Sequence, residues 1–326
     1  MDWLLQPDSM GMKFVVMLIA VLLFALVMAA VLLLVDRPSL PRWVAATGYL
    51  GPSLLLIVMG LMIPAFMTIR NSLYANDQST FVGLDNYAAI FSQDLFLVVL
   101  RNTFFWVLVV PLLSTALGLV YAVLVDRTRF EKFAKTLIFL PMAISMVGAS
   151  IIWRFVYEYK PAGADQTGLL NQILVLFGGQ PQQFLINPTI NTFYLIIVMV
   201  WIQTGFAMTV LSAAIKAIPD ETIEAAKMDG ATGLRLFWQI TVPSVRPAII
   251  VVLTTVAMAT LKAFDVVRTM TGGQFDSSII ALEFYTQTFT RQAGGIGAAL
   301  AVLLFILVTP IIIYNVRQMR ITEGER

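Results

Sequence analysis

Long apolar runs alternate with short polar connectors along almost the whole chain. Seven runs are long enough to cross a bilayer as a helix, which takes about 20 apolar residues. They lie near residues 14–35, 44–66, 97–125, 136–157, 191–214, 247–268 and 296–316. Lipid offers no partner for free backbone groups, so each run must form its own hydrogen bonds. The pattern predicts an all-α, polytopic transmembrane helical bundle.

The Lys and Arg residues are divided unevenly between the two sets of connectors. One set, together with the C-terminal tail, holds 13 of the 21 basic residues: Arg37, Arg42, Arg127, Arg129, Lys132, Lys135, Lys216, Lys227, Arg235, Arg246, Arg317, Arg320 and Arg326. Cytosolic connectors carry such an excess. We therefore expect the C-terminus to be cytosolic and, with seven spans, the N-terminus to lie outside.

Composition narrows the chemistry that the chain performs. It is 59% hydrophobic and 12% charged, with a mean hydropathy of +0.85, whereas soluble domains carry about twice that charge. The chain has no His and no Cys, which argues against a metalloenzyme or a Ser-His-Asp hydrolase. We expect no catalytic residues, no metal site and, at a net charge of +2, no nucleic-acid partner. No Walker A motif is present, so ATP would have to bind to another chain.

The polar segment between the fifth and sixth runs has the features of a short helix. Pro219, Asp220 and Glu221 suit a helix start, because Pro fits the first turn and acids favour its positive end. Glu224 lies one turn beyond Glu221, so both can share a face. Gly230 suits the helix end, because Gly accepts a positive φ without strain.

A second amphipathic piece is expected to follow this helix. Phe237, Trp238 and Ile240 can seat it at the membrane interface, and Pro243 and Pro247 mark the break before the next run. A rigid short helix between two spans is able to transmit force from a partner.

The spacing of this segment resembles the EAA loop in the membrane subunits of ATP-driven (ABC) importers. The matching positions are Glu224, Ala225, Ala226, Asp229, Gly230, Ala231, Phe237, Ile240, Pro243 and Pro247. The resemblance implies a helix that docks on a cytosolic ATPase through Glu221, Glu224, Ala225, Ala226, Asp229, Gly230 and Ala231. A solvated amphipathic loop is the alternative, but it leaves the regular Gly and Pro spacing unexplained.

Further segments are similar to the carbohydrate branch of these importers. They read WIQTGFAMTVLSAAIKAIPDETIEAAKMDGA (201–231), KAFDVVRTMTGGQFDSSIIALEFY (262–285) and FVGLDNYAAIF (81–91), followed by RNT (101–103). The likeness is greatest to the branch typified by the larger permease subunit of the maltose importer. Two features depart from it: the outer connectors are short, and Gln274-Phe275 replaces a common Gly-Pro pair.

The resemblance implies a domain organisation. Residues 44–316 would form the six-helix core of a type I ABC importer, with the EAA loop at 214–247 as its coupling helix. Residues 1–43 would add one N-terminal transmembrane anchor, because the first run is too long for a secretory signal and basic residues follow it. Residues 317–326 would form a cytosolic tail. The chain would sit in the inner membrane of a prokaryote.

The resemblance also implies partners and a cofactor held elsewhere. We expect a heterodimer with a second permease subunit, two ATP-binding subunits that bind ATP and Mg, and an extracytoplasmic sugar-binding protein. Apart from these proteins, the chain would contact membrane lipid, and it would bind no cofactor itself.

When the chain is matched to the maltose-type branch from Trp201 and Thr271, the resemblance implies five sugar-facing positions: Ile202, Gln203, Phe206, Thr260 and Ala263. They combine hydrogen-bonding groups with an apolar ring face, as a sugar requires, and the branch suggests an α-linked di- or oligosaccharide. A Thr in a span often bonds only its own helix backbone. Lys262 and Asp265 lie three residues apart, so they can pair with each other instead of facing the sugar.

Two other functional classes remain open from the residues alone. An ion- or proton-coupled secondary transporter would show inverted repeats and membrane-depth acids, but the spans hold few charges and no repeat is apparent. A membrane-bound enzyme would need reactive groups, and the chain lacks His and Cys.

Overall fold

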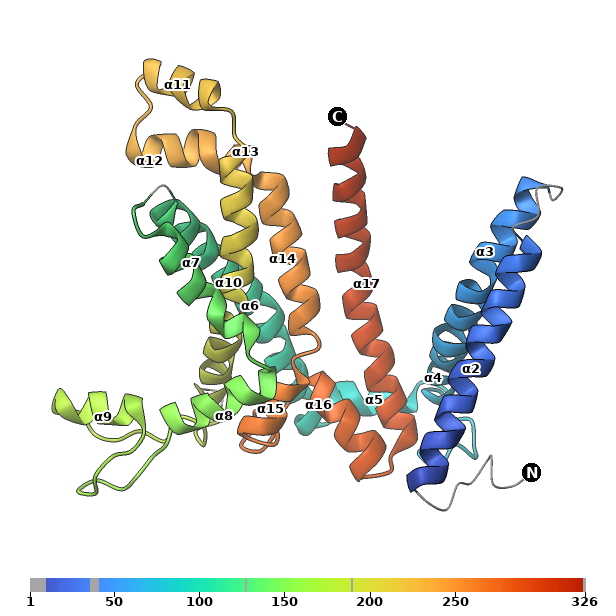
Figure 1. The fold of residues 1–326 in the computed structure, drawn as a ribbon. Helices are drawn as coiled ribbons and strands as arrows, with labels where there is room; N and C mark the ends of the chain where they lie inside the picture. The colour runs from blue at the N-terminus through green and yellow to red at the C-terminus, as the bar shows by residue number, and fades with distance from the viewer. Residues whose placement is uncertain (1–9, 36–40, 127, 189, 325–326) are drawn as a thin grey trace. The chain divides into compact units, whose positions relative to one another are not determined.

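The structure is a computed structural model of the 326-residue chain, and it describes residues 10–35, 41–126, 128–188 and 190–324. These residues form helices joined by turns (Figure 1), and one isolated β-bridge joins Tyr74 to Phe81. The chain divides into two compact units, residues 1–68 and 69–326, each with its own packing.

The first unit is a pair of helical stretches with apolar surfaces on all sides. Its helices are α2 (Met10–Val35), α3 (Arg42–Ile57), the π-helix η1 (Val58–Met62) and α4 (Ile63–Asn71), which runs across the boundary between units. In the most apolar part of each stretch, no residue is buried by the rest of the protein. Such surfaces suit a lipid environment. Arg37, Arg127 and Arg326, three of the basic residues on which the orientation rests, lie outside the described residues.

The second unit contains the remaining helices. They are α5 (Asp85–Ser92), α6 (Asp94–Val125), α7 (Glu131–Phe139), η2 (Leu140–Ala143), α8 (Met146–Val156), α9 (Leu169–Leu176), α10 (Ile190–Lys216), α11 (Asp220–Met228), α12 (Gly233–Leu236), η3 (Phe237–Thr241), α13 (Val242–Ser244), α14 (Arg246–Thr260), α15 (Phe264–Met270), α16 (Ile280–Tyr285), η4 (Thr286–Thr290) and α17 (Gly294–Gly324).

The centre of this unit is the close packing of α6 against α10. A Cβ on Gly118 would lie 2.5 Å from the Cβ of Ala207, so only glycine lets the two backbones approach this far. Trp106 from α6 and Met199 from α10 are both almost fully buried in the resulting core. Gly205, on another side of α10, has the same role against α7, because a Cβ there would lie 2.6 Å from the carbonyl oxygen of Ile138.

Two of the predicted runs are not straight helices. The run at 136–157 bends by 102° between η2 and α8, where the Ser145 hydroxyl accepts a hydrogen bond from the Gly148 N–H at 3.1 Å and caps α8. The run at 247–268 is interrupted after Thr260, and α15 begins only at Phe264. Apolar composition alone does not reveal such breaks, because both sides of each break remain apolar.

The long helices connect two functional ends of the second unit (Figure 1). The short helices α11 and α12 lie at one end of α10 and α14, and α8, α9, α15 and α16 lie at the other. We call these the α11 end and the α15 end. Helix α10 runs between them, from Ile190 to Lys216.

Candidate coupling segment and substrate path

The predicted coupling helix is α11, and its two ends follow from its sequence. Pro219 adopts φ −58° and ψ 137° just before the helix, and two acids occupy the first turn. At the other end, Gly230 has φ +82°. The Gly230 N–H donates to the Lys227 carbonyl at 3.0 Å, and the Ala231 N–H donates to the Ala226 carbonyl at 2.9 Å. These two bonds form a Schellman cap, which requires a left-handed residue at the glycine position.

The cap explains why glycine is needed in this turn. A Cβ on Gly230 would meet no atom within 4 Å, so the requirement comes from φ and not from crowding. Ala226 and Ala231 occupy the two positions whose apolar side chains commonly meet in this cap, and they are only 7% and 6% exposed. The DGA part of the pattern therefore describes a helix stop.

The opposite face of α11 is open to a partner. Glu221, Glu224, Ala225 and Met228 are exposed at spacings that place them on one face of the helix. Met228 is 88% exposed. The two neighbouring alanines thus differ: Ala225 lies on the exposed face, whereas Ala226 faces inward. Asp229, the C-cap residue, is exposed as well.

The second piece of the coupling segment (residues 219–245) is formed by α12, η3 and α13. Leu234 and Trp238 are 77% and 63% exposed, and the rings of Phe237 and Trp238 meet edge to face at 5.1 Å. A bend of 70° then separates this piece from α14. The predicted second amphipathic piece and the break before the next run are therefore both present.

A cluster of ion pairs at the α11 end joins the last turns of α10 to α7 and to the residue that follows α6. The Lys135 ammonium lies 2.5 Å from Asp126 Oδ1 and 2.9 Å from Glu131 Oε1. Ser212 Oγ donates to the same Asp126 oxygen at 2.7 Å, and Lys216, the last residue of α10, pairs with Glu131. Sequence reasoning used these lysines only to assign topology and missed the cluster, because its members come from three helices.

The five expected sugar-facing residues occupy different environments. Ile202 and Ala263 are 4% and 0% exposed and share one hydrophobic cluster. Thr260 is also buried. Its hydroxyl donates to the Val256 carbonyl at 2.7 Å, so it bonds the backbone of its own helix, as a Thr in a span often does. Phe206 is half-buried. Gln203 is 8% exposed, and its amide has no hydrogen-bond partner among the described residues.

The break between α14 and α15 falls beside two of these positions. Helical hydrogen bonding stops at Leu261–Ala263, where the Phe264 N–H donates to the Lys262 carbonyl at 2.8 Å. Lys262 is exposed and Asp265 is half-buried, and these two described residues do not form an ion pair, so the pairing alternative is wrong. Across the described ranges, no group of acidic side chains is suited to hold a metal ion.

The RNT segment holds the turn that follows the TGG sequence. The Asn102 amide donates to the Asp276 carbonyl at 2.6 Å and to the Ser278 carbonyl at 3.0 Å. Thr103 accepts a hydrogen bond from the Ile280 N–H at 3.0 Å. The Asn191 amide donates to the Phe275 carbonyl at 2.7 Å. These buried polar residues of α6 and α10 therefore fix what we call the rim turn, residues 271–279.

The other quoted motif has a similar structural role. Asn86, within FVGLDNYAAIF, donates to the carbonyls of Ser72 and Tyr74, both at 2.8 Å. Tyr87 donates to the Ser72 hydroxyl at 2.7 Å. These bonds attach the connector before α5 to the start of that helix.

Comparison with known proteins decides the class of this molecule. Residues 98–320, well over half of the chain, match the family described as "Binding-protein-dependent transport system inner membrane component". The chain belongs to this family. Membership favours the importer interpretation over a secondary transporter or a membrane-bound enzyme, and it agrees with the all-α, multi-pass architecture.

Several relatives are similar along most of their length. The alpha-glucoside transport system permease protein AglF of Rhizobium meliloti is 47% identical over 85% of this chain and 82% of its own length. The osmoprotective compounds uptake permease protein GgtC of Synechocystis sp. is 44% identical over 85% of this chain and all of its own. The trehalose/maltose transport system permease protein MalF of Thermococcus litoralis is 30% identical over 81% and 90%.

A solved structure supports the fold. A chain of the bacterial alginate ABC transporter, solved in complex with an alginate pentasaccharide-bound periplasmic protein, superposes with a TM-score of 0.71. The match covers 82% of this chain and 91% of that one at 21% identity. This chain thus has the fold of an ABC transporter membrane subunit.

Proposed function

We propose that this chain is the permease subunit of an ATP-driven ABC importer for a carbohydrate of the α-glucoside type. It forms one half of the translocation path, and a second permease subunit forms the other. Two ATP-binding subunits hold ATP and Mg and perform the hydrolysis, and an extracytoplasmic sugar-binding protein delivers the substrate. The names of AglF and of the trehalose/maltose permease support this substrate class.

The observation that carries the proposal is the exposed face of α11. This helix is closed by a Schellman cap and presents Glu221, Glu224, Ala225 and Met228 away from its own chain. An exposed methionine beside small and acidic residues suits insertion into a partner's groove. Ala226 and Ala231 would contribute indirectly, by keeping the turn compact, and Asp229 and Gly230 by ending the helix at the correct residue.

The substrate would pass the broken span at the α14–α15 junction. Irregular backbone at membrane depth is tolerated where it lines a cavity or is covered by protein. Gln203 supports this location because its amide lacks a partner among the described residues, and a sugar hydroxyl would satisfy it. Ile202, Phe206, Thr260 and Ala263 would shape the path around that contact.

The orientation of the termini is part of the proposal. The α11 end faces the cytosol and the α15 end faces outward, with the N-terminus outside. Since the chain has no Cys, a single Ser9→Cys variant should react with an impermeant thiol reagent, whereas Thr322→Cys should react only after the membrane is opened. Ser9 lies outside the described residues. Labelling in the opposite pattern would reverse the assignment.

The test of the function is reconstitution of the complete transporter. We would purify this chain with its co-purifying subunits, place the complex in proteoliposomes and measure uptake of radiolabelled maltose, trehalose and sucrose. Uptake should require ATP and the binding protein and should persist when an ionophore collapses ion gradients. Uptake by this chain alone, or uptake driven by a proton gradient without ATP, would refute the proposal.

A charge reversal on α11 tests the role of its exposed face. Glu224→Lys should reduce ATP-driven uptake by about tenfold or more, with normal amounts of this chain in the membrane, because a lysine would face the partner's groove. Thr222→Lys adds the same side chain to an exposed position off that face and should have a smaller effect. Equal losses in the two variants would argue against a specific docking face.

A further inference from the structure

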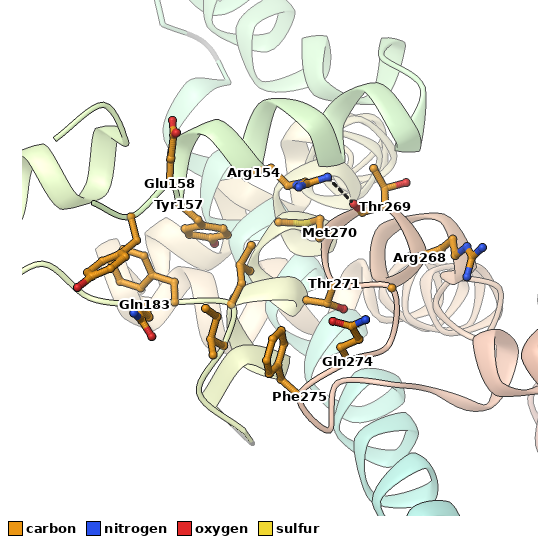
Figure 2. A pocket seen from close by; sticks show the side chains of 15 residues that line it. Arg154, Tyr157, Glu158, Gln183, Arg268, Thr269, Met270, Thr271, Gln274 and Phe275 are labelled. Carbon is orange, nitrogen blue, oxygen red and sulfur yellow. Dashed lines mark hydrogen bonds between the residues drawn. The ribbon is translucent and has the colours of Figure 1, made fainter. Parts of the chain in front are cut away.

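A cavity of about 570 Å³ opens at the α15 end of the second unit (Figure 2). Its walls are the end of α8 with the residues after it (Arg154–Tyr159), the segment 183–186, and residues 268–275 from α15 and the rim turn. The volume lies within the range of about 300–1,000 Å³ that is typical of small-molecule sites. None of the five positions matched from the family lines this cavity.

One wall of this cavity is a strained turn that is fixed from outside. Phe275 and Asp276 both have φ +55°, a conformation that non-glycine residues rarely adopt. Asn191 binds the carbonyl of Phe275, and Asn102 binds the carbonyl of Asp276. Both asparagines are at most 1% exposed. Strained residues that the surrounding structure holds in this way are often found at ligand sites.

The opposite wall is fixed by a third buried asparagine. Asn171 is fully buried, and its amide nitrogen donates to the carbonyls of Glu158 at 2.7 Å and Gln182 at 3.1 Å. Its amide oxygen accepts from the Gln182 N–H at 2.8 Å. A Cβ on Gly168 would overlap the Glu158 carbonyl, so this wall is also closely packed. Both walls are therefore set before any ligand arrives, which lowers the ordering cost of binding.

The side chains that face the cavity combine aromatic and hydrogen-bonding groups. Phe275 is 44% exposed and Tyr159 is 37% exposed, so each has ring surface available. Gln183 and Gln274 are exposed amides that offer both donors and acceptors. Figure 2 shows both glutamines and Phe275 around the cavity. Arg154 is held at the edge by a hydrogen bond from its guanidinium to the Thr269 carbonyl at 3.3 Å.

We propose that this cavity is a subsite for one pyranose ring of the transported glycoside, which occupies it before it reaches the α14–α15 junction. The inference rests on the proposed function. A pyranose has an apolar face that packs on an aromatic ring and equatorial hydroxyls that pair with amides and carboxylates. The Phe275 ring supplies the first contact, and the amides of Gln183 and Gln274 supply the second.

The alternative occupant is a side chain of the docked binding protein. Arg154, Arg268 and Glu158 also line the cavity. The preformed walls, the exposed Phe275 ring and the two glutamine amides favour a neutral polyhydroxylated ligand over a single charged side chain. The two occupants can be told apart by what protects the cavity. Free sugar alone would protect a ring subsite, whereas only the binding protein would protect a docking contact.

Protection of a single thiol tests the proposal directly. In the assembled complex, Gln274→Cys introduces the only thiol of this chain, and we would measure its rate of reaction with an impermeant maleimide. Maltose or maltotriose at saturating concentration, without binding protein, should slow labelling at least about threefold. Ala162→Cys, in the exposed connector between α8 and α9 and outside the cavity, should react at the same rate with and without sugar.

Uptake kinetics give a second, independent measurement. Phe275→Ala should raise the KM for maltotriose uptake about tenfold, while the concentration of binding protein that gives half-maximal ATPase stimulation stays unchanged. Unslowed labelling together with a shift only in that binding-protein concentration would overturn the subsite and indicate a docking contact. A wild-type complex that transports none of the sugars would instead overturn the proposed function, and this inference with it.

Discussion

The coupling segment and the rim turn are both short, irregular connections next to helix ends, but different kinds of bonds hold them. In the coupling segment, the bonds that end α11 join residues three and five positions apart. In the rim turn, the amides that bind Phe275 and Asp276 come from residues 84 and 174 positions away. The first shape is encoded locally, and the second depends on the packing of the whole unit.

Because of this difference, the coupling segment and the rim turn should respond differently to movement of the helices. A segment that keeps its shape by itself can follow a moving partner as one piece. A turn held by α6 and α10 keeps its position only while those two helices stay in register. We therefore expect the coupling segment to tolerate changes elsewhere in the chain, and the rim turn to be sensitive to them.

The largest expected effect comes from the cap of α11. Gly230→Pro should abolish ATP-driven uptake, because proline fixes φ near −65° and lacks the N–H that binds the Lys227 carbonyl. Uptake in proteoliposomes, at matched amounts of inserted protein, is the measurement. Gly230→Asn is the matched control and should retain most activity, since Asn tolerates positive φ. Normal uptake by Gly230→Pro would show that the segment does not depend on its local cap.

The next effect concerns the long-range bonds of the rim turn. Asn102→Leu leaves the Asp276 and Ser278 carbonyls without their donor, at a cost of about 1 to 3 kcal/mol. We expect faster proteolysis within residues 271–279 and at least about tenfold lower uptake. The exposed Asn187→Leu introduces the same change without loss of a hydrogen bond among the described residues and should behave as wild type. An unchanged proteolysis rate in Asn102→Leu would remove the distinction between the two regions.

A moderate effect is expected midway between the two regions, at Gln203. Gln203→Ala should lower uptake, because a sugar hydroxyl loses its partner and the binding free energy of the sugar falls by about 1 to 3 kcal/mol. Thermal stability should change little through hydrogen bonding, because the amide has no partner in the described protein. Gln203→Met keeps the side-chain volume and should lose uptake to a similar degree. Wild-type kinetics in both variants would place the path elsewhere.

The smallest effect should follow from the ion pair of Lys216, which lies just before the coupling segment. The Lys216 side chain is 46% exposed, and exposed pairs contribute about 0–1 kcal/mol. Lys216→Gln should change uptake by less than about twofold. Lys135→Gln should do more damage, because the Lys135 side chain is only 24% exposed and its ammonium contacts Asp126, Glu131 and Ser212. If Lys216→Gln abolished uptake, the coupling segment would depend on its neighbours more than its local bonds suggest.

The same contrast explains what could be predicted from sequence. The spans, the start of α11 at Asp220 and its stop at Gly230 follow from apolar length and local backbone chemistry, and the structure agrees with them. The bend at Ser145 and the break after Thr260 do not follow, because apolar composition continues across both. Asn102 stands out in the sequence only as part of the RNT segment, and its partners could not be predicted, because they lie on a turn that only folding brings close.

The residues of the cavity at the α15 end were beyond prediction for a related reason. Glu158, Gln183 and Gln274 come from three connectors, none of which carries a recognisable ligand motif. The Gln274-Phe275 departure from the common Gly-Pro pair was visible in the sequence. Its consequence, a strained turn with an exposed ring, required the backbone.

The contact between Gly118 and Ala207 has a geometric consequence for the whole transporter. With no space between the backbones there, α10 can tilt against α6 about this point but cannot slide closer. Ala207 lies 17 residues from the first residue of α10 and nine from the last, or about 26 Å and about 14 Å at 1.5 Å per residue. The helix is thus an unequal lever whose fulcrum lies nearer the α11 end, so a swing of its short arm moves the far tip nearly twice as far.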